Sequence, residues 1–140
     1  MRVMLDTNVL ISGMVFRGPE RRLLEVIRRS HTLVVTDYLL AEAREVLARK
    51  FPGREGLLDA LLQSFRVERL PLPPIGKVRE ASHHLRDPKD AAVLASALQA
   101  CPEVFVSGDK DLHTPEVLAL IRVCSTKQAL ALLEQGSGAR

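Results

Sequence analysis

Short apolar runs alternate with longer amphipathic segments along this chain. Five short runs, several of them β-branched, predict strands at residues 2–5, 32–36, 66–70, 104–107 and 122–124. Longer segments with apolar residues at helical spacing predict helices at residues 19–29, 38–50, 55–64, 76–85, 88–100, 114–120 and 126–134. Because helices separate the strands, we expect an α/β fold in which helices cover both faces of a mostly parallel sheet of about five strands.

The length of 140 residues is typical of one domain. We expect a single domain over residues 1–135 and a disordered tail over residues 136–140, which read GSGAR. The Pro-rich connector at residues 71–76 is too short to divide domains. An apolar stripe at Leu57, Leu58, Leu61 and Leu62 suits either the core or a dimer interface.

Composition excludes several classes of protein. Hydrophobic residues make up 46% and charged residues 26% of the chain, which excludes a disordered protein. No apolar run is long enough for a membrane span, and an Asp interrupts the apolar N-terminal stretch, which makes a poor secretion signal. Only two cysteines are present, without metal-type spacing. We therefore expect a cytoplasmic protein without a membrane partner.

The net charge of +3 is carried mainly by arginine, and five arginines lie between residues 17 and 29. Arginine binds phosphate groups in a bidentate manner, so a nucleic-acid partner is one interpretation. A solvated helix face on which Glu20 and Glu25 alternate with the arginines is the other. Aromatic residues make up only 4% of the chain, which does not favour recognition by base stacking.

Acidic residues follow the predicted strands, where a parallel sheet gathers its functional groups. The candidates that follow strands are Asp6, Asp37, Asp109 and Asp111. Glu42 lies on the helix after the second strand, and Asp87 and Asp90 open the helix that leads to the fourth. Thr36 or Asp37, and also Asp87, are well placed as helix caps, whereas Asp6 and Asp109 follow apolar strands, where a carboxylate needs a functional reason. Converging carboxylates repel one another unless a cation neutralises them, and hard oxygen ligands select Mg²⁺ or Mn²⁺ over zinc. The sequence therefore predicts a divalent metal site at the strand ends.

Four segments occur in order along the chain: LDTNVLISG, TDYLLAEAREVL, RDPKDAAVLASAL and VFVSGDKDL. They resemble motifs of the PIN-domain family, and in particular the toxins of toxin–antitoxin pairs related to VapC ribonucleases. The resemblance implies an α/β/α sandwich, RNA cleavage dependent on one or two Mg²⁺ or Mn²⁺ ions, and a cytoplasmic location. It also implies a cognate antitoxin and a homodimer or higher homo-oligomer as partners.

The same resemblance assigns roles to individual residues. The catalytic and metal-binding acids fall on Asp6, Glu42, Asp90 and Asp109, with Asp111 as a fifth metal ligand. Supporting positions fall on Asn8, Thr36 and Ser107. Ala91 stands where many relatives carry Asn or Asp, which removes a polar neighbour but none of the four acids. We expect the RNA backbone to be held by Arg17, Arg21, Arg86 and Lys110.

These observations predict a metal-dependent RNA endonuclease that acts as a toxin. An alternative is a non-catalytic PIN-like protein, without metal activity, held by an antitoxin or an RNA-processing assembly. A phosphotransfer domain is a third reading, but Asn8 occupies the position where a haloacid-type phosphatase needs its second Asp.

Overall fold

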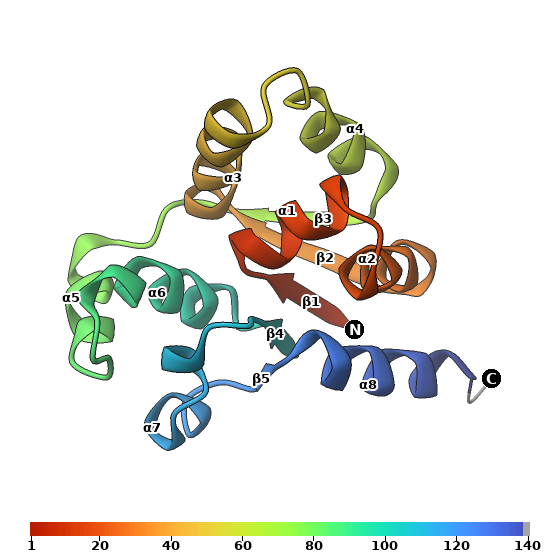
Figure 1. Cartoon of the computed structure of the whole chain (residues 1–140). Helices are drawn as coiled ribbons and strands as arrows, with labels where there is room; N and C mark the ends of the chain where they lie inside the picture. Colours follow the sequence, from red (N-terminus) through yellow and green to blue (C-terminus); the bar gives the residue numbers. More distant parts are fainter. Residues whose placement is uncertain (139–140) are drawn as a thin grey trace.

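A five-stranded parallel sheet forms the centre of the computed structural model, which describes residues 1–138. The strand order is β3-β2-β1-β4-β5 (Figure 1). The strands are β1 (Arg2–Leu5), β2 (Thr32–Thr36), β3 (Val67–Leu70), β4 (Val104–Val106) and β5 (Val123–Cys124). Every pairing is parallel, with Val3 opposite Leu33 on one side and Val104 on the other. The predicted fold class is thus confirmed.

Helices cover both faces of this sheet. They are α1 (Thr7–Val15), α2 (Pro19–Ser30), α3 (Asp37–Lys50), α4 (Gly56–Ser64), α5 (Ile75–Ser82), α6 (Ala91–Ala100), α7 (Pro115–Leu118) and α8 (Thr126–Gly138). Two short 3₁₀ turns, η1 (Pro88–Asp90) and η2 (Lys110–Leu112), lie in the connections at the carboxyl edge. No helix among the described residues is both long enough and apolar enough to span a bilayer.

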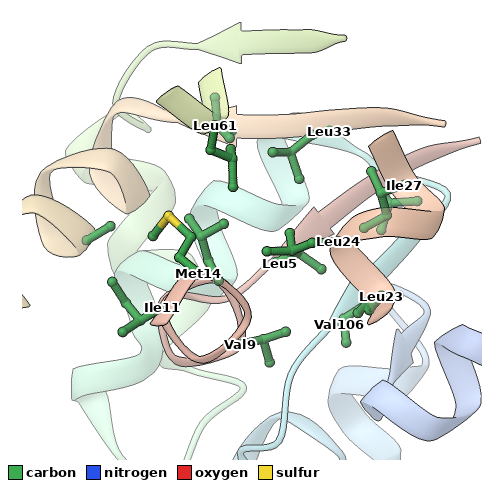
Figure 2. Close-up of a cluster of buried hydrophobic side chains, with 14 of the residues drawn as sticks. Leu5, Val9, Ile11, Met14, Leu23, Leu24, Ile27, Leu33, Leu61 and Val106 are labelled. Atoms are coloured by element: carbon green, nitrogen blue, oxygen red, sulfur yellow. The ribbon is translucent and has the colours of Figure 1, made fainter. Parts of the chain in front are cut away.

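Alternation along the strands divides the core into two layers. Val3 and Leu5 of β1 face one side of the sheet, and Met4, which is fully buried, faces the other. Residues of α1, α2 and α4 cluster on the first side (Figure 2), where α8 and the inner face of α3 also pack. Helices α5, α6 and α7 pack on the second side. The result is a three-layer α/β/α arrangement that leaves the carboxyl ends of β1 and β4 accessible.

Helix α1 is an element that the hydrophobic pattern did not predict. Six of its nine residues are buried, so its apolar positions do not form the one-sided stripe that reveals a surface helix. Its first turn is capped by Asp6, whose side chain accepts a hydrogen bond from the Val9 amide. At Gly13 the helix passes so close to α2 that an added Cβ would lie 2.6 Å from the Leu24 side chain.

Two further expectations need correction. The helix predicted over residues 88–100 begins as the separate turn η1, with Asp87 as its predicted cap. The final helix continues to Gly138, past the start of the predicted tail, and residues 139–140 lie outside the described part of the chain. In the leucine stripe, Leu58 and Leu61 are buried in the core and Leu57 and Leu62 pack against it, which confirms the core interpretation of this stripe.

Candidate acidic site at the carboxyl edge of the sheet

Asp6 occupies the junction between β1 and α1. Its amide donates a hydrogen bond of 3.0 Å to the Val106 carbonyl, which continues the pairing of β1 with β4. One carboxylate oxygen accepts from the Val9 amide at 2.9 Å, and the other accepts from the Ser107 hydroxyl. With 8% of its surface exposed, Asp6 is held in one orientation at the floor of the site. Its position next to a buried strand therefore serves both as a helix cap and as a fixed carboxylate.

Ser107 connects Asp6 with Asp109. The serine is fully buried just after β4, and its hydroxyl oxygen accepts a hydrogen bond of 3.0 Å from the Asp109 amide while the hydroxyl donates to Asp6. Asp109 in turn caps η2, because its carboxylate accepts from the Asp111 amide at 2.9 Å. His113 Nε2 lies 2.6 Å from the Ser107 carbonyl oxygen. These bonds join the ends of two neighbouring strands into one rigid unit.

Glu42 approaches the site from α3. Its Oε1 accepts a hydrogen bond from the Thr7 hydroxyl, and its Oε2 accepts from the Tyr38 hydroxyl at 3.4 Å. Thr7 is a residue that sequence reasoning missed, although it lies between Asp6 and Asn8 in the D-T-N motif. Thr36, which was predicted to support the site, is buried and caps α3 by accepting from the Leu39 amide at 3.3 Å. Thr36 therefore positions the helix that carries Glu42 and does not line the site.

A second group of acids lies beside the first. Asp87, Asp90 and Asp111 each place a carboxylate oxygen within 4.8 Å of the others. Asp87 also caps η1 by accepting from the Lys89 amide at 3.0 Å, so its predicted capping role is confirmed, and it faces the acidic group as well. Asp90 precedes α6 and makes no capping hydrogen bond with its side chain. Its carboxylate remains available to the site.

Two adjoining hollows bring these residues together. One, of about 270 Å³, is lined by all four predicted catalytic acids, Asp6, Glu42, Asp90 and Asp109. The other, of about 450 Å³, shares Asp6, Asn8 and Asp109 with the first and extends toward α2 and α8. Asn8 thus lines both, as expected for a supporting residue. A larger hollow of about 600 Å³ beside α5 and α6 contains none of these acids.

Electrostatics favours a cation in this site. Burial raises the pKa of Asp6 above its ordinary value, and Asp109 and Glu42 raise it further, against the hydrogen bonds from Ser107 and Val9. The pKa of Asp90 is raised to about 6 by burial and then by Asp109, with smaller contributions from Asp87 and Asp111. Carboxylates that oppose one another's ionisation provide hard oxygen donors whose negative charges lack a neutralising cation. The donor set therefore fits a divalent cation such as Mg²⁺ or Mn²⁺.

The cations that line the site differ from the four that were predicted. Arg17, Arg86 and Lys110 are exposed, and Arg21 donates to the carbonyl oxygens of Gly13 and Met14 at the end of α1. None of these four side chains lines either acidic hollow. The first hollow is lined instead by Arg49, Lys50 and Lys89. Helical spacing could have revealed two of them, because Arg49 and Lys50 follow Glu42 at seven and eight residues and share its face of α3.

Comparison with known proteins agrees with this architecture. VapBC2 from Rickettsia felis, crystallised with a DNA fragment from its promoter, matches with a TM-score of 0.67 and 16% identity over 89% of this chain and 98% of that chain. PAE2754 from Pyrobaculum aerophilum matches with a TM-score of 0.65 and 17% identity over 96% of both chains. FitAcB from Neisseria gonorrhoeae matches with a TM-score of 0.60 and 20% identity over 89% of this chain and 98% of that chain.

Comparison at the level of sequence identifies a family but no individual relative. No curated protein sequence matches the chain. A family model described as the PIN domain matches residues 2–111, which include every one of the predicted acids. This match covers most of the chain and agrees with the motif resemblance, the parallel sheet and the acidic strand ends. The chain therefore belongs to the PIN domain family.

Proposed function

We propose that this protein is a metal-dependent endoribonuclease that hydrolyses phosphodiester bonds. One observation carries the proposal: Asp6, Glu42, Asp90 and Asp109, from four separate segments of the chain, line one hollow at the carboxyl edge of the sheet. Membership of the PIN domain family, whose members are generally nucleases, supports the same activity. RNA as the substrate follows from the resemblance to VapC-like ribonucleases.

The carboxylates divide into a deep part and an outer part. Asp6 and Asp109, joined through Ser107, form the deep part, and Asp90 with Asp111 forms the outer part. Together with Glu42 these residues would hold one or two Mg²⁺ or Mn²⁺ ions. When bound, a divalent cation activates water as a nucleophile and offsets the charge that develops on the phosphate.

The side chains of this protein contribute orientation and proton acceptance. Ser107 and the Val9 amide fix both oxygens of Asp6, and Thr7 and Tyr38 hold the two oxygens of Glu42. Such fixed carboxylates need no reorganisation during the reaction. A carboxylate of this set accepts the proton of the attacking water.

The test compares the wild-type protein with the Asp6→Asn variant in an RNA cleavage assay with added Mg²⁺ or Mn²⁺. Asparagine is as good a helix N-cap as aspartate, so this variant keeps the start of α1 while it loses the negative charge. We expect cleavage to fall by at least about 100-fold, the size of a typical catalytic-group deletion. The control is Asp59→Asn, at an exposed carboxylate that pairs with Arg44 and lines neither acidic hollow. Equal cleavage by wild type and Asp6→Asn ends the proposal.

We further propose that the protein is the toxin of a toxin–antitoxin pair and acts in the cytoplasm. The support is the resemblance to VapC-like toxins together with the shared fold of the Rickettsia felis VapBC2 and Neisseria gonorrhoeae FitAcB proteins. Induced expression of the wild-type chain in a bacterial host should arrest growth, and the Asp6→Asn variant should not. Growth that is unaffected by the active nuclease would exclude the toxin role and leave the nuclease itself standing.

A further inference from the structure

The acidic site opens into two hollows whose walls differ in charge. Both contain Asp6, Asn8 and Asp109, so both give access to the same carboxylates. The first is bordered by α3 and the turn η1, and the second by α1, α2 and the start of α8. A polyanion that reaches the carboxylates passes along one of these sides or along both.

The first hollow has a cationic wall, formed by Arg49, Lys50 and Lys89. Arg49 forms an ion pair of 3.1 Å with Glu45, an exposed residue that does not line the hollow. Within residues 1–138, none of the three cations forms an ion pair with a carboxylate of the acidic site. The acids of the site therefore do not neutralise the charges of these three residues, which are available to bind a phosphate.

The second hollow offers a different lining. Beyond the shared residues, Ser12, Glu20 and Thr126 border it, and the Ser12 hydroxyl donates a hydrogen bond of 3.3 Å to Glu20. No lysine or arginine among the described residues lines this side. A phosphate placed here would meet Glu20 as well as Asp6 and Asp109. A phosphate is therefore repelled on this side of the site and attracted on the side of the cationic wall, so the two sides are not equivalent.

Base recognition by stacking has little support in either hollow. Among the described residues, no aromatic side chain lines the first hollow or the second. A single strand held without aromatic platforms is bound mainly through its phosphates, and such binding is strongly dependent on salt.

We propose that the cationic wall of Arg49, Lys50 and Lys89 binds the sugar–phosphate backbone of single-stranded RNA on one side only of the acidic site. The backbone contacts this wall next to the phosphate to be cleaved, and the side of Ser12, Glu20 and Thr126 makes no phosphate contact. The proposal rests on the proposed ribonuclease function for its substrate. It adds a surface that binds the RNA, formed by cations other than the four expected from the sequence.

The test measures RNA binding without divalent cation, so that no cleavage occurs. A short fluorescein-labelled single-stranded RNA is titrated with protein at several salt concentrations, and anisotropy gives the binding constant. The triple variant Arg49→Ala/Lys50→Ala/Lys89→Ala should flatten the slope of log K against log salt by about 2, since each phosphate contact on a single strand contributes about 0.7. At molar salt, charge effects are screened and we expect the wild type and the variant to bind equally. The difference in slope then corresponds to about 50-fold weaker binding by the variant near physiological salt.

A charge-matched control is available at the opposite edge of the sheet. Arg28 and Arg29 lie in the last turn of α2, and Arg122 precedes β5. The variant Arg28→Ala/Arg29→Ala/Arg122→Ala therefore removes the same charge near the amino ends of the strands (Figure 1). This control and the Glu20→Gln variant should both leave the slope unchanged. An equal loss of slope in the control would show diffuse electrostatic binding and overturn the proposal. A steeper slope in Glu20→Gln would show that RNA contacts both sides and would overturn it as well.

The result is independent of hydrolysis. If the wall variant loses slope in the salt titration while wild type and Asp6→Asn cleave RNA equally, the RNA-binding surface is supported and the nuclease proposal is refuted. Cleavage that requires Asp6, together with an unchanged slope in the wall variant, would keep the nuclease and end the binding surface.

Discussion

Replacing Asp90 by asparagine should stabilise the metal-free protein, although it removes a residue of the proposed active site. The carboxyl of Asp90 lies among Asp87, Asp109 and Asp111, and its pKa is raised from 3.8 to about 6. Its ionisation at neutral pH therefore works against folding. An asparagine removes the charge, and its amide group can donate to Asp109 as a protonated Asp90 would. No helix cap is lost, because the Asp90 side chain makes no capping hydrogen bond.

The size and sign of the effect follow from the pKa of Asp90. A shift of about two units corresponds at most to about 3 kcal/mol. Water reaches this partly buried carboxyl and screens its neighbours, so we expect a gain of about 1–2 kcal/mol at pH 7.5. The pKa of Asp90 is higher in the folded protein than in the unfolded chain. Below pH 3.8 the residue is therefore protonated in both states and costs no stability, and its cost grows as the pH rises through about 6. The advantage of the variant should therefore appear between these two values and be complete above them.

Urea denaturation in the presence of a chelator, followed by circular dichroism at several pH values, gives the free energy of unfolding of both proteins. The control, Asp59→Asn, should change stability by less than about 0.5 kcal/mol, as exposed surface substitutions usually do. Added Mg²⁺ should reduce the advantage of Asp90→Asn, because it stabilises the protein that binds it better. A variant that is no more stable than wild type at pH 7.5 would refute the argument that the acids of this site repel one another.

Two further substitutions test how the site is supported. Gly13→Ala should destabilise the protein by about 1–3 kcal/mol in urea denaturation, because its Cβ would lie 2.6 Å from Leu24 Cδ1 and 2.9 Å from the Glu20 carbonyl oxygen; an unchanged midpoint would mean that α1 and α2 pack less tightly than described. Ser107→Ala should cost about 2 kcal/mol in the same measurement, since it removes a buried hydrogen bond to Asp6. It should also weaken Mn²⁺ binding measured by calorimetry, and full metal affinity would show that the serine does not position the carboxylate.

Much of the architecture could be predicted from local patterns. The strands could be recognised because buried parallel strands are short apolar or β-branched runs, and the predicted segments match β1 to β5 within one residue at each end. Helix α1 could not be recognised, because its buried residues surround most of the helix and leave only a narrow polar stripe at Asn8 and Ser12. A helix buried on several sides has no hydrophobic period that single-sequence reasoning can detect.

Candidate site residues were partly predictable for a related reason. Asp6 and Asp109 follow strands, and in a parallel sheet the carboxyl ends of all strands lie at one edge. Their proximity therefore follows from the fold class alone. Thr7 escaped notice because its role depends on the hydrogen bond to Glu42, a residue on a different helix. The three cations that line the first hollow escaped notice for the same reason, since charge along the sequence does not say which arginine or lysine faces a given hollow.

The amino-acid sequence by itself determined the strands, the helices other than α1, the parallel sheet and the acidic residues at its carboxyl edge, because these depend on periodicity and on residues close in the chain. Only the tertiary structure decided that Ser107 joins Asp6 to Asp109 and that Arg49, Lys50 and Lys89 border the same hollow. Those contacts depend on how β1 pairs with β4 and how α3 and η1 pack at the edge of the sheet. Such long-range packing is set by the whole core and not by any one segment.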